Sequence, residues 1–201
     1  MKLVLASNNA KKLVELQALF APLGVELVTQ GSLGIPEAEE PFDTFVENAL
    51  TKARHAARAS GLPALADDSG LAVDALGGAP GVLSARYATL FGRAKSDAEN
   101  NAVLLEKLAG AADRRGRFVC ALVAVRSAAD PEPLIAMGRW EGEVLEQAQG
   151  EGGFGYDPLL FIPALGKSVA ELGADAKNRV SHRALAAQEL LAQMRAAWHL
   201  G

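Results

Sequence analysis

Apolar and polar positions alternate between two periods along the first part of the chain. Residues 2–6 form a short apolar run of strand-forming residues, and from Ala10 the pattern becomes helical. The apolar positions of this helix are spaced by three and four: Leu13, Leu16 and Phe20. Proline and glycine within residues 22–24 end the helix, and residues 25–29 predict a second strand. The order strand, polar turn, helix, strand is typical of an α/β protein.

A second amphipathic helix follows a long loop. Residues 30–43 predict the loop, and Thr44 with Glu47 three residues later predicts a capping box at the start of the helix. A glycine and a proline within residues 61–63 end it. Three polar side chains lie away from its apolar stripe and are able to face a ligand: Asn48, Lys52 and His55.

The rest of the chain alternates strands with helices. The predicted strands are 64–66, 71–73, 117–126, 134–145 and 159–162, and the predicted helices are 97–108 and 181–198. The two long strands are predicted to be neighbours in an antiparallel pair. Because no repeat and no linker divides the chain, residues 1–201 are predicted to form a single domain of two lobes.

Composition narrows the class of protein. Half of the residues are hydrophobic, which is enough for a real core, and the net charge of −4 argues against a general nucleic-acid binder. Cys120 is the one cysteine, so no internal disulfide is expected, and its apolar neighbours predict a buried thiol. No apolar stretch is long enough to span a membrane, so we expect a cytoplasmic protein without a membrane partner.

The turn between the first strand and the first helix is a candidate phosphate site. Backbone N–H groups at a helix N-terminus favour an anion, and the lysines that follow add positive charge. The residues of this turn are Ser7, Asn8, Asn9, Ala10, Lys11 and Lys12. The alternative is an ordinary polar turn in which Ser7 or Asn8 caps the helix.

Two adjacent acids, Asp67 and Asp68, are predicted at a strand end. Carboxylates in this position suit Mg²⁺, and one of them is able to take a proton from a water that attacks phosphorus. The alternative is a turn whose acids accept backbone hydrogen bonds. A second acidic pair, Glu39 and Glu40, has the residue type of a metal ligand, but on its own it predicts a solvated loop.

A glycine-rich segment at residues 150–158 is a candidate ligand loop. It contains G-x-G-x-x-G, but it leads into a strand and not a helix, so a dinucleotide fingerprint is rejected. Phe154 is able to stack on a base, or alternatively Phe154 and Tyr156 pack in the core. At the start of the last helix, His182 and Arg183 are donors suited to a carbonyl or phosphate oxygen, or alternatively solvated residues of a capped helix.

Taken in order, these segments resemble the inosine/xanthosine triphosphate pyrophosphatase family over nearly the whole chain. The matching segments are residues 7–12, 44–53, 66–71, 78–87, 152–158 and 181–183. The resemblance implies an elongated α/β fold with a mixed β-sheet and flanking helices, two lobes around a central substrate cleft, and a homodimer. It implies hydrolysis of a non-canonical purine nucleoside triphosphate, such as ITP, dITP or XTP, to the monophosphate and pyrophosphate.

The resemblance also implies a role for individual residues. Asp68 is implied as the catalytic acid–base and as a ligand of Mg²⁺, together with Glu39 or Glu40 and with Asp67 as a further candidate. Triphosphate binding is implied for residues 7–12 and Lys52. Contacts with the rest of the nucleotide are implied for Ser69, Phe154, Gly155, Tyr156, Asp157, Lys177, His182 and Arg183.

Two other functions remain open at this stage. One is a triphosphate pyrophosphatase with a different base preference, and the other is a nucleotide-binding module without catalysis. Donors aimed at a 6-oxygen would discriminate against adenine, because a 6-amino group would leave buried donors unpaired.

Overall fold

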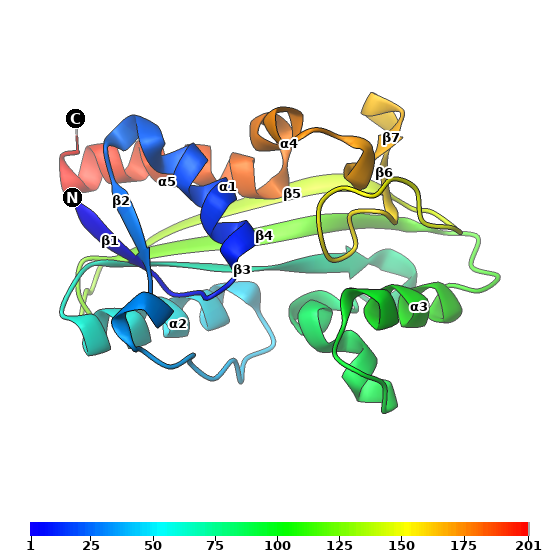
Figure 1. Cartoon of the computed structure of the whole chain (residues 1–201), viewed down its shortest axis with the longest axis horizontal. Helices are drawn as coiled ribbons and strands as arrows, with labels where there is room; N and C mark the ends of the chain where they lie inside the picture. Colours follow the sequence, from blue (N-terminus) through cyan, green and yellow to red (C-terminus); the bar gives the residue numbers. More distant parts are fainter. Residues whose placement is uncertain (201) are drawn as a thin grey trace. The chain divides into compact units, whose positions relative to one another are not determined.

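The computed structural model describes residues 1–200 (Figure 1). Its strands are β1 (Lys2–Leu5), β2 (Glu26–Thr29), β3 (Ala64–Val73), β4 (Arg115–Val125), β5 (Leu134–Val144), β6 (Leu160–Ile162) and β7 (Lys167–Ser168). Its α-helices are α1 (Ala10–Phe20), α2 (Phe45–Ser60), α3 (Asp97–Lys107), α4 (Ala174–Val180) and α5 (His182–Trp198). Short 3-10 segments lie at Ala21–Leu23, Gly31–Leu33, Asp74–Leu76, Gly81–Phe91, Pro163–Leu165 and Val169–Glu171.

The strands form one seven-stranded sheet in the order β2-β1-β3-β4-β5-β6-β7. β1 pairs in parallel with β2 and β3, whereas β6 pairs antiparallel with both β5 and β7. The sheet is therefore mixed, and the predicted α/β class with flanking helices is confirmed. The predicted adjacency of the two long strands, β4 and β5, is also confirmed.

Two compact units share this sheet. Unit 1 consists of residues 1–68, 120–138 and 181–201, and unit 2 consists of residues 69–119 and 139–180. Strands β3, β4 and β5 contribute residues to both units. Within residues 1–200, none of the helices combines the length and the apolar character needed to cross a bilayer.

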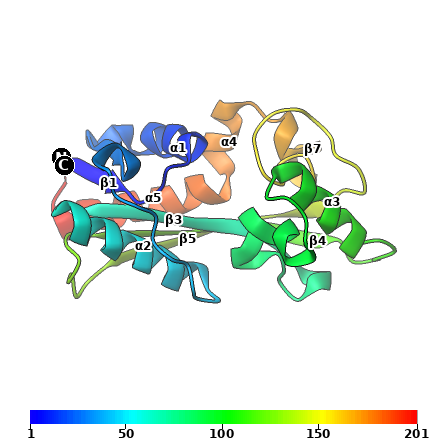
Figure 2. The same ribbon diagram turned by 60° about the horizontal axis from the view of Figure 1, so that its bottom comes forward.

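In unit 1, helices cover both faces of the sheet (Figures 1 and 2). One core cluster joins α1 and α5 to alternate strand residues that include Leu5, Leu65 and Leu122. A second cluster joins the alanine face of α2 to the residues in between, such as Ala66 and Val123. Because successive side chains of a strand point to opposite faces, this alternation decides which helix each β3 residue faces.

Unit 2 has its own apolar core. Leu71 of β3, Phe118 of β4 and Trp140 of β5 pack there with residues that include Leu104 of α3 and Tyr156 of the glycine-rich segment. Ser168 and Glu171 form a full capping box that opens a 3-10 turn.

Three local features differ from the sequence prediction. β3 does not end at the two aspartates but runs through them as one ten-residue strand, because flanking apolar residues keep both halves of the strand buried. Helix α4 was not predicted, since its seven residues are too few for a clear apolar period. Asn9, and not Ser7 or Asn8, caps α1, through its side-chain oxygen.

Candidate active site

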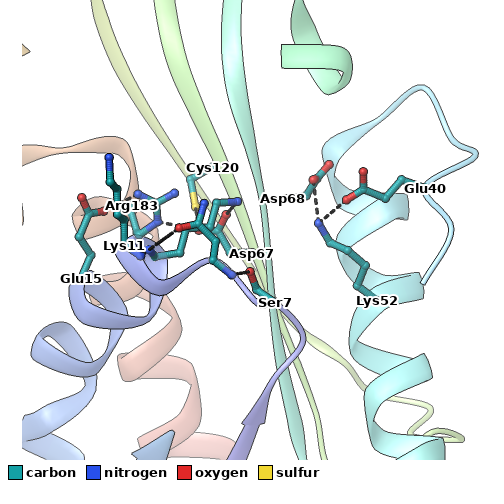
Figure 3. A network of polar contacts seen from close by, with 11 residues as sticks. Ser7, Lys11, Glu15, Glu40, Lys52, Asp67, Asp68, Cys120 and Arg183 are labelled. Carbon is teal, nitrogen blue, oxygen red and sulfur yellow. Dashed lines mark hydrogen bonds and ion pairs between the residues drawn. The ribbon is translucent and has the colours of Figure 1, made fainter. Parts of the chain in front are cut away.

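Asp67 and Asp68 lie in the middle of β3 and face opposite sides of the sheet (Figure 3). Asp67 has the parity of Leu65 and therefore faces α1 and α5, whereas Asp68 has the parity of Ala66 and faces α2. Both are buried, with 1% and 7% of their surface exposed. Two adjacent carboxylates thus enter two separate environments within unit 1.

Asp67 lies between two cations and a thiol. Lys12 Nζ donates to Asp67 Oδ1 at 2.6 Å, and Arg183 Nε donates to Oδ2 at 2.7 Å. The thiol of Cys120 also donates to Oδ2, at 3.3 Å. Burial alone would raise the pKa of Asp67, but Arg183 and Lys12 hold that pKa well below its usual value. Asp67 is therefore a charged acceptor at neutral pH.

Arg183 is completely buried and joins Asp67 to the first helix. Its Nη1 donates to the carboxylate of Glu15 on α1, so two acids flank one guanidinium. Burial lowers the pKa of Arg183, but the two carboxylates raise it by more, so the net pKa is raised and the side chain stays charged. The sequence singled out Arg183 as a nucleotide contact, whereas the structure places its guanidinium among protein carboxylates. Sequence reasoning missed Glu15, whose helical position carries no distinguishing signal.

Asp68 lies on the other face with one lysine and a second acid. Lys52 Nζ on α2 donates to Asp68 Oδ1 at 2.9 Å and to Glu40 Oε1 at 2.7 Å. Burial, together with the nearby carboxylate of Glu40, raises the pKa of Asp68 above its usual value despite the lowering by Lys52. Burial lowers the pKa of Lys52, but the carboxylates of Asp68 and Glu40 more than compensate and leave it raised.

The second oxygen of Asp68 is buried and has no hydrogen-bond partner among residues 1–200. A buried carboxylate oxygen without a partner is costly unless a ligand, a proton or a metal meets it. Glu40 supplies a second carboxylate to the same lysine, whereas Glu39 is exposed. No cluster of three or more acids, histidines or cysteines is present in the described chain. Two carboxylates suffice for Mg²⁺, which usually keeps waters and takes substrate phosphates as further ligands.

The turn before α1 is more occupied than its sequence suggests. The side-chain oxygen of Asn9 accepts from the N–H groups of Lys11 and Lys12, so the helix cap already satisfies these two donors. The hydroxyl of Ser7 accepts from the N–H of Asn9. The amide of Asn8 donates to Glu37 at 3.3 Å and packs against Gly31, where an added Cβ would lie 2.4 Å from the Asn8 oxygen.

The start of α5 is packed tightly against β5. Ser181 caps the helix by accepting from the N–H of Ala184, and His182 is buried. A Cβ at Gly138 of β5 would lie 1.9 Å from the backbone oxygen of His182, so only glycine permits this approach. This requirement fixes where His182 and Arg183 sit in unit 1, and no motif in the sequence indicated it.

Unit 2 holds a separate cluster around Phe154. Lys177 Nζ donates to Asp157 Oδ2 at 2.8 Å and lies 4.6 Å from the centre of the Phe154 ring. Asp157 Oδ2 also accepts from the N–H of Phe154 at 2.9 Å. Both partners of the ion pair are buried, whereas Phe154 is half-buried. The ammonium group thus lies against an aromatic face, as in a cation–π contact.

The remaining residues of the glycine-rich segment hold this cluster in place. Tyr156 is a core residue whose hydroxyl donates to the backbone oxygen of Ser84, so its side chain is committed to packing. Gly155 is held by two α3 side chains: Asp97 accepts from its N–H and Asn101 donates to its oxygen. Sequence reasoning missed Asp97 and Asn101, which look like ordinary residues of a helix start.

The structure thus sorts the predicted residues into three groups. The first group is Lys12, Asp67 and Arg183, the second is Glu40, Lys52 and Asp68, and the third is Phe154, Asp157 and Lys177. Glu39 joins none of them. Ser69 is half-buried on β3 in unit 2, next in sequence to the aspartates.

The mixed sheet with its flanking helices makes this an α/β protein, and the buried aspartates of β3 are held in lysine–carboxylate pairs. A model of the Ham1 family matches residues 3–193. The chain belongs to the Ham1 family.

Individual relatives are similar over their full length. A protein of Leptothrix cholodnii named dITP/XTP pyrophosphatase is 68% identical, with 100% of each chain covered. A protein of the same name from Methylibium petroleiphilum is 67% identical, over 98% of this chain and 99% of that protein. The solved structure of a HAM1 protein from Coxiella burnetii has a TM-score of 0.90 at 45% identity, over 98% of this chain and 100% of that one.

Proposed function

We propose that this protein hydrolyses non-canonical purine nucleoside triphosphates (dITP, XTP and ITP) to the monophosphate and pyrophosphate. The single observation that carries the proposal is the pair of unlike aspartates on β3: one is locked in ion pairs, and the other has a raised pKa and a buried oxygen without a partner. The names of the full-length relatives support the same activity.

Asp68 is the proposed catalytic residue. Its raised pKa suits a group that takes a proton from water, and Lys52 holds its other oxygen so that Oδ2 faces the reaction. The water oxygen forms a bond to the α-phosphorus, the bond from that phosphorus to the bridging oxygen breaks, and pyrophosphate leaves. The proton of the water passes to Asp68 Oδ2.

The triphosphate is the proposed ligand of the turn at residues 7–12 and of Lys52. Lys11 and Lys12 bring positive charge to the α1 N-terminus, and Ser7, Asn8, Asn9 and Ala10 form the backbone of the turn. Lys12 contacts Asp67 and Lys52 contacts Asp68, so both ammonium groups lie beside the aspartate pair that includes the proposed catalytic residue.

Mg²⁺ is the proposed metal, and Asp68 and Glu40 are the residues that would hold it. We favour Glu40 over Glu39 because only Glu40 shares a lysine with Asp68. Asp67 is the weaker candidate, since both of its oxygens already accept from Lys12, Arg183 and Cys120. When bound, the metal neutralises the charge of the polyphosphate and of the leaving pyrophosphate.

The purine is the proposed ligand of the unit 2 cluster. Phe154 offers a half-buried ring for stacking, and the Asp157–Lys177 pair provides a donor beside it. We propose that Lys177 reads the 6-oxo group, that Gly155 and Ser69 contribute contacts, and that Tyr156 acts through packing. His182 of unit 1 is proposed separately as a donor to the nucleotide. Arg183 acts through Asp67, since its guanidinium is held by carboxylates.

A substrate panel tests the proposed function. Pyrophosphate release is measured with dITP, XTP, dATP and dTTP at saturating Mg²⁺, and dITP and XTP are expected to give the highest kcat/KM. A preference for dTTP would instead favour a pyrophosphatase of another base specificity. Binding of dITP without turnover would favour a nucleotide-binding module.

Phe154→Ala tests the base site. Loss of a stacked ring is expected to weaken transition-state binding of dITP by about 1–3 kcal/mol, by analogy with stacking in nucleic-acid-binding proteins. The readout is kcat/KM for dITP, with the exposed Phe91→Ala as the matched aromatic control. Equal kinetics for Phe154→Ala and the control would make Phe154 a packing residue.

Two further properties are proposed with the function. The cytoplasm, which holds the nucleotide pool, is the proposed compartment, and a homodimer is the proposed assembly. Light scattering coupled to gel filtration measures the mass in solution, and a mass equal to the 21.0 kDa of one chain would contradict the dimer.

A further inference from the structure

Three polar side chains form a stripe along one face of α2. Asn48, Lys52 and His55 are spaced by four and three residues, so they lie one above another on the helix. Each contacts the same segment of chain, residues 36–42, which we call the acidic segment. Asn48 contacts Phe42, Lys52 contacts Glu40 and His55 contacts Pro36. The acidic segment therefore runs along the stripe in the direction opposite to the helix.

Asn48 grips one end of the acidic segment. Its side-chain oxygen accepts from the N–H of Phe42 at 3.0 Å, and its side-chain nitrogen donates to the oxygen of Phe42 at 2.9 Å. Only 1% of Asn48 is exposed. The place of Asn48 off the apolar stripe suggested that it faces a ligand. Because the oxygen and the nitrogen of its carboxamide both bind the backbone of Phe42, it acts on the acidic segment instead.

His55 grips the other end. Its Nε2 lies 2.9 Å from the oxygen of Pro36. A carbonyl oxygen only accepts, so Nε2 carries the proton and donates. This hydrogen bond involves the backbone oxygen of Pro36 and not its side chain. Any side chain with a donor at the same reach is therefore able to replace His55.

Glu40 lies between these two anchors. It is two residues from Phe42 and four from Pro36, and its carboxylate meets Lys52, which also holds Asp68. Fixing both ends of a short segment removes most of its conformational freedom before any ligand arrives. The carboxylate of Glu40 is therefore held beside the same ammonium group as that of Asp68, and less backbone entropy remains to be lost when a cation binds.

We infer that Asn48 and His55 are positioning residues that hold the acidic segment so that Glu40 is preorganised beside Asp68 for a divalent cation. The inference rests on the proposed function, in which Glu40 and Asp68 hold Mg²⁺. It assigns the two outer members of the α2 stripe to metal affinity, and only the central member, Lys52, to the substrate.

The test compares Asn48→Ala and His55→Ala with two controls. His55→Gln keeps a donor nitrogen at similar reach, and Arg58→Ala removes an exposed charge from the same helix. Hydrogen exchange in peptides that cover residues 36–43 is measured on the metal-free protein. The Mg²⁺ concentration that gives half-maximal pyrophosphate release from dITP is measured at saturating nucleotide.

Both alanine variants are expected to exchange faster in residues 36–43 and to need about tenfold more Mg²⁺, as for other partners that orient metal ligands. Their kcat at saturating Mg²⁺ is expected to recover toward wild type. His55→Gln and Arg58→Ala are expected to match wild type in both measurements. This split between metal dependence and kcat separates positioning from a general loss of structure.

Unchanged Mg²⁺ dependence in both alanine variants overturns the inference, whether or not exchange is faster. Asn48 is buried, so near-ultraviolet circular dichroism checks that Asn48→Ala folds. If it does not fold, the comparison of His55→Ala with His55→Gln tests the inference, because His55 is half-buried. If wild type does not release pyrophosphate from dITP, the proposed function fails, whereas the hydrogen-exchange comparison still reports whether Asn48 and His55 hold the segment.

Discussion

Two aspartates on opposite faces of β3 in unit 1 have opposite pKa shifts. On the α1/α5 face, Asp67 meets two cations, Lys12 and Arg183, and its pKa falls well below the usual value. On the α2 face, Asp68 shares a single cation with Glu40, and its pKa rises. Burial opposes ionisation on both faces, so the ratio of cations to acids decides the outcome.

This comparison explains why two adjacent acids are useful. A base must lose and gain a proton near the working pH, whereas an anchor for cations must stay charged. In the proposed function, one strand supplies both, because alternate residues face different helices.

Asp68→Asn is expected to lower kcat by a factor of about 10²–10⁴, because the amide cannot take the proton of the water. The measurement is pyrophosphate release from dITP, and dITP binding by calorimetry should remain detectable. A variant that keeps near-normal turnover would show that the reacting base lies elsewhere.

Asp67→Asn is expected to lower the free energy of unfolding by about 3–5 kcal/mol, because Arg183 and Lys12 lose their buried counter-charge. Asp68→Asn should cost much less, since Lys52 keeps Glu40. Urea unfolding at neutral pH measures both. Equal losses would mean that the two faces contribute alike to stability.

The same pair of variants gives a pH test with a fixed sign. The folded pKa of Asp67 is depressed, so its contribution to stability is present above the usual carboxyl pKa and is lost as pH falls through the folded value. The folded pKa of Asp68 is raised, so its ionisation costs stability as pH rises from the usual value through the folded one. The stability that Asp67→Asn loses relative to wild type should therefore shrink as pH is lowered from neutral to acidic.

Lys52→Met is expected to move the acid limb of the kcat/KM profile to higher pH. Lys52 lowers the pKa of Asp68, so its removal raises that pKa further and the base is protonated over a wider range. Lys12→Met is the matched control, because Lys12 contacts Asp67 directly and affects Asp68 only weakly. An equal displacement in both variants would contradict the separation of the two faces.

Cys120→Ala is expected to cost about 1 kcal/mol of stability through the lost hydrogen bond to Asp67. Cys120→Ser keeps a donor at the same position and separates this loss from that of side-chain volume. Both variants should retain kcat, since Asp68 is on the other face. A fall in kcat comparable to that of Asp68→Asn would show that the two faces are coupled in the reaction.

Much of the fold follows from local patterns. Helices α1, α2, α3 and α5 carry apolar residues at helical spacing and begin at side-chain caps. Strand β4 contains a long apolar run, and β5 alternates buried with exposed positions. The same patterns misplaced the end of β3, because Asp67 and Asp68 interrupt the apolar run while the chain stays extended. Short elements such as α4 have too few residues for any period to emerge.

The candidate site followed from residue types, but its pairings did not. The residue types around Asp67 and Asp68 indicated acid chemistry, and only the family resemblance distinguished the two residues. The choice between Glu39 and Glu40 depends on a loop without periodicity, where only the contact with Lys52 distinguishes them. Asn48 stood out by its place off the apolar stripe, and its partner Phe42 became visible only in the folded chain.

By itself, the amino-acid sequence determined the succession of helices and strands and which residues carry acidic, basic and aromatic groups, because these depend on neighbours within a few positions. Only the tertiary structure decided that Lys12, Cys120 and Arg183 converge on Asp67 and that Lys52 joins Asp68 to Glu40. Those partners come from distant parts of the chain, and the pKa of a buried acid depends on the charges within a few ångströms, wherever they lie in the sequence.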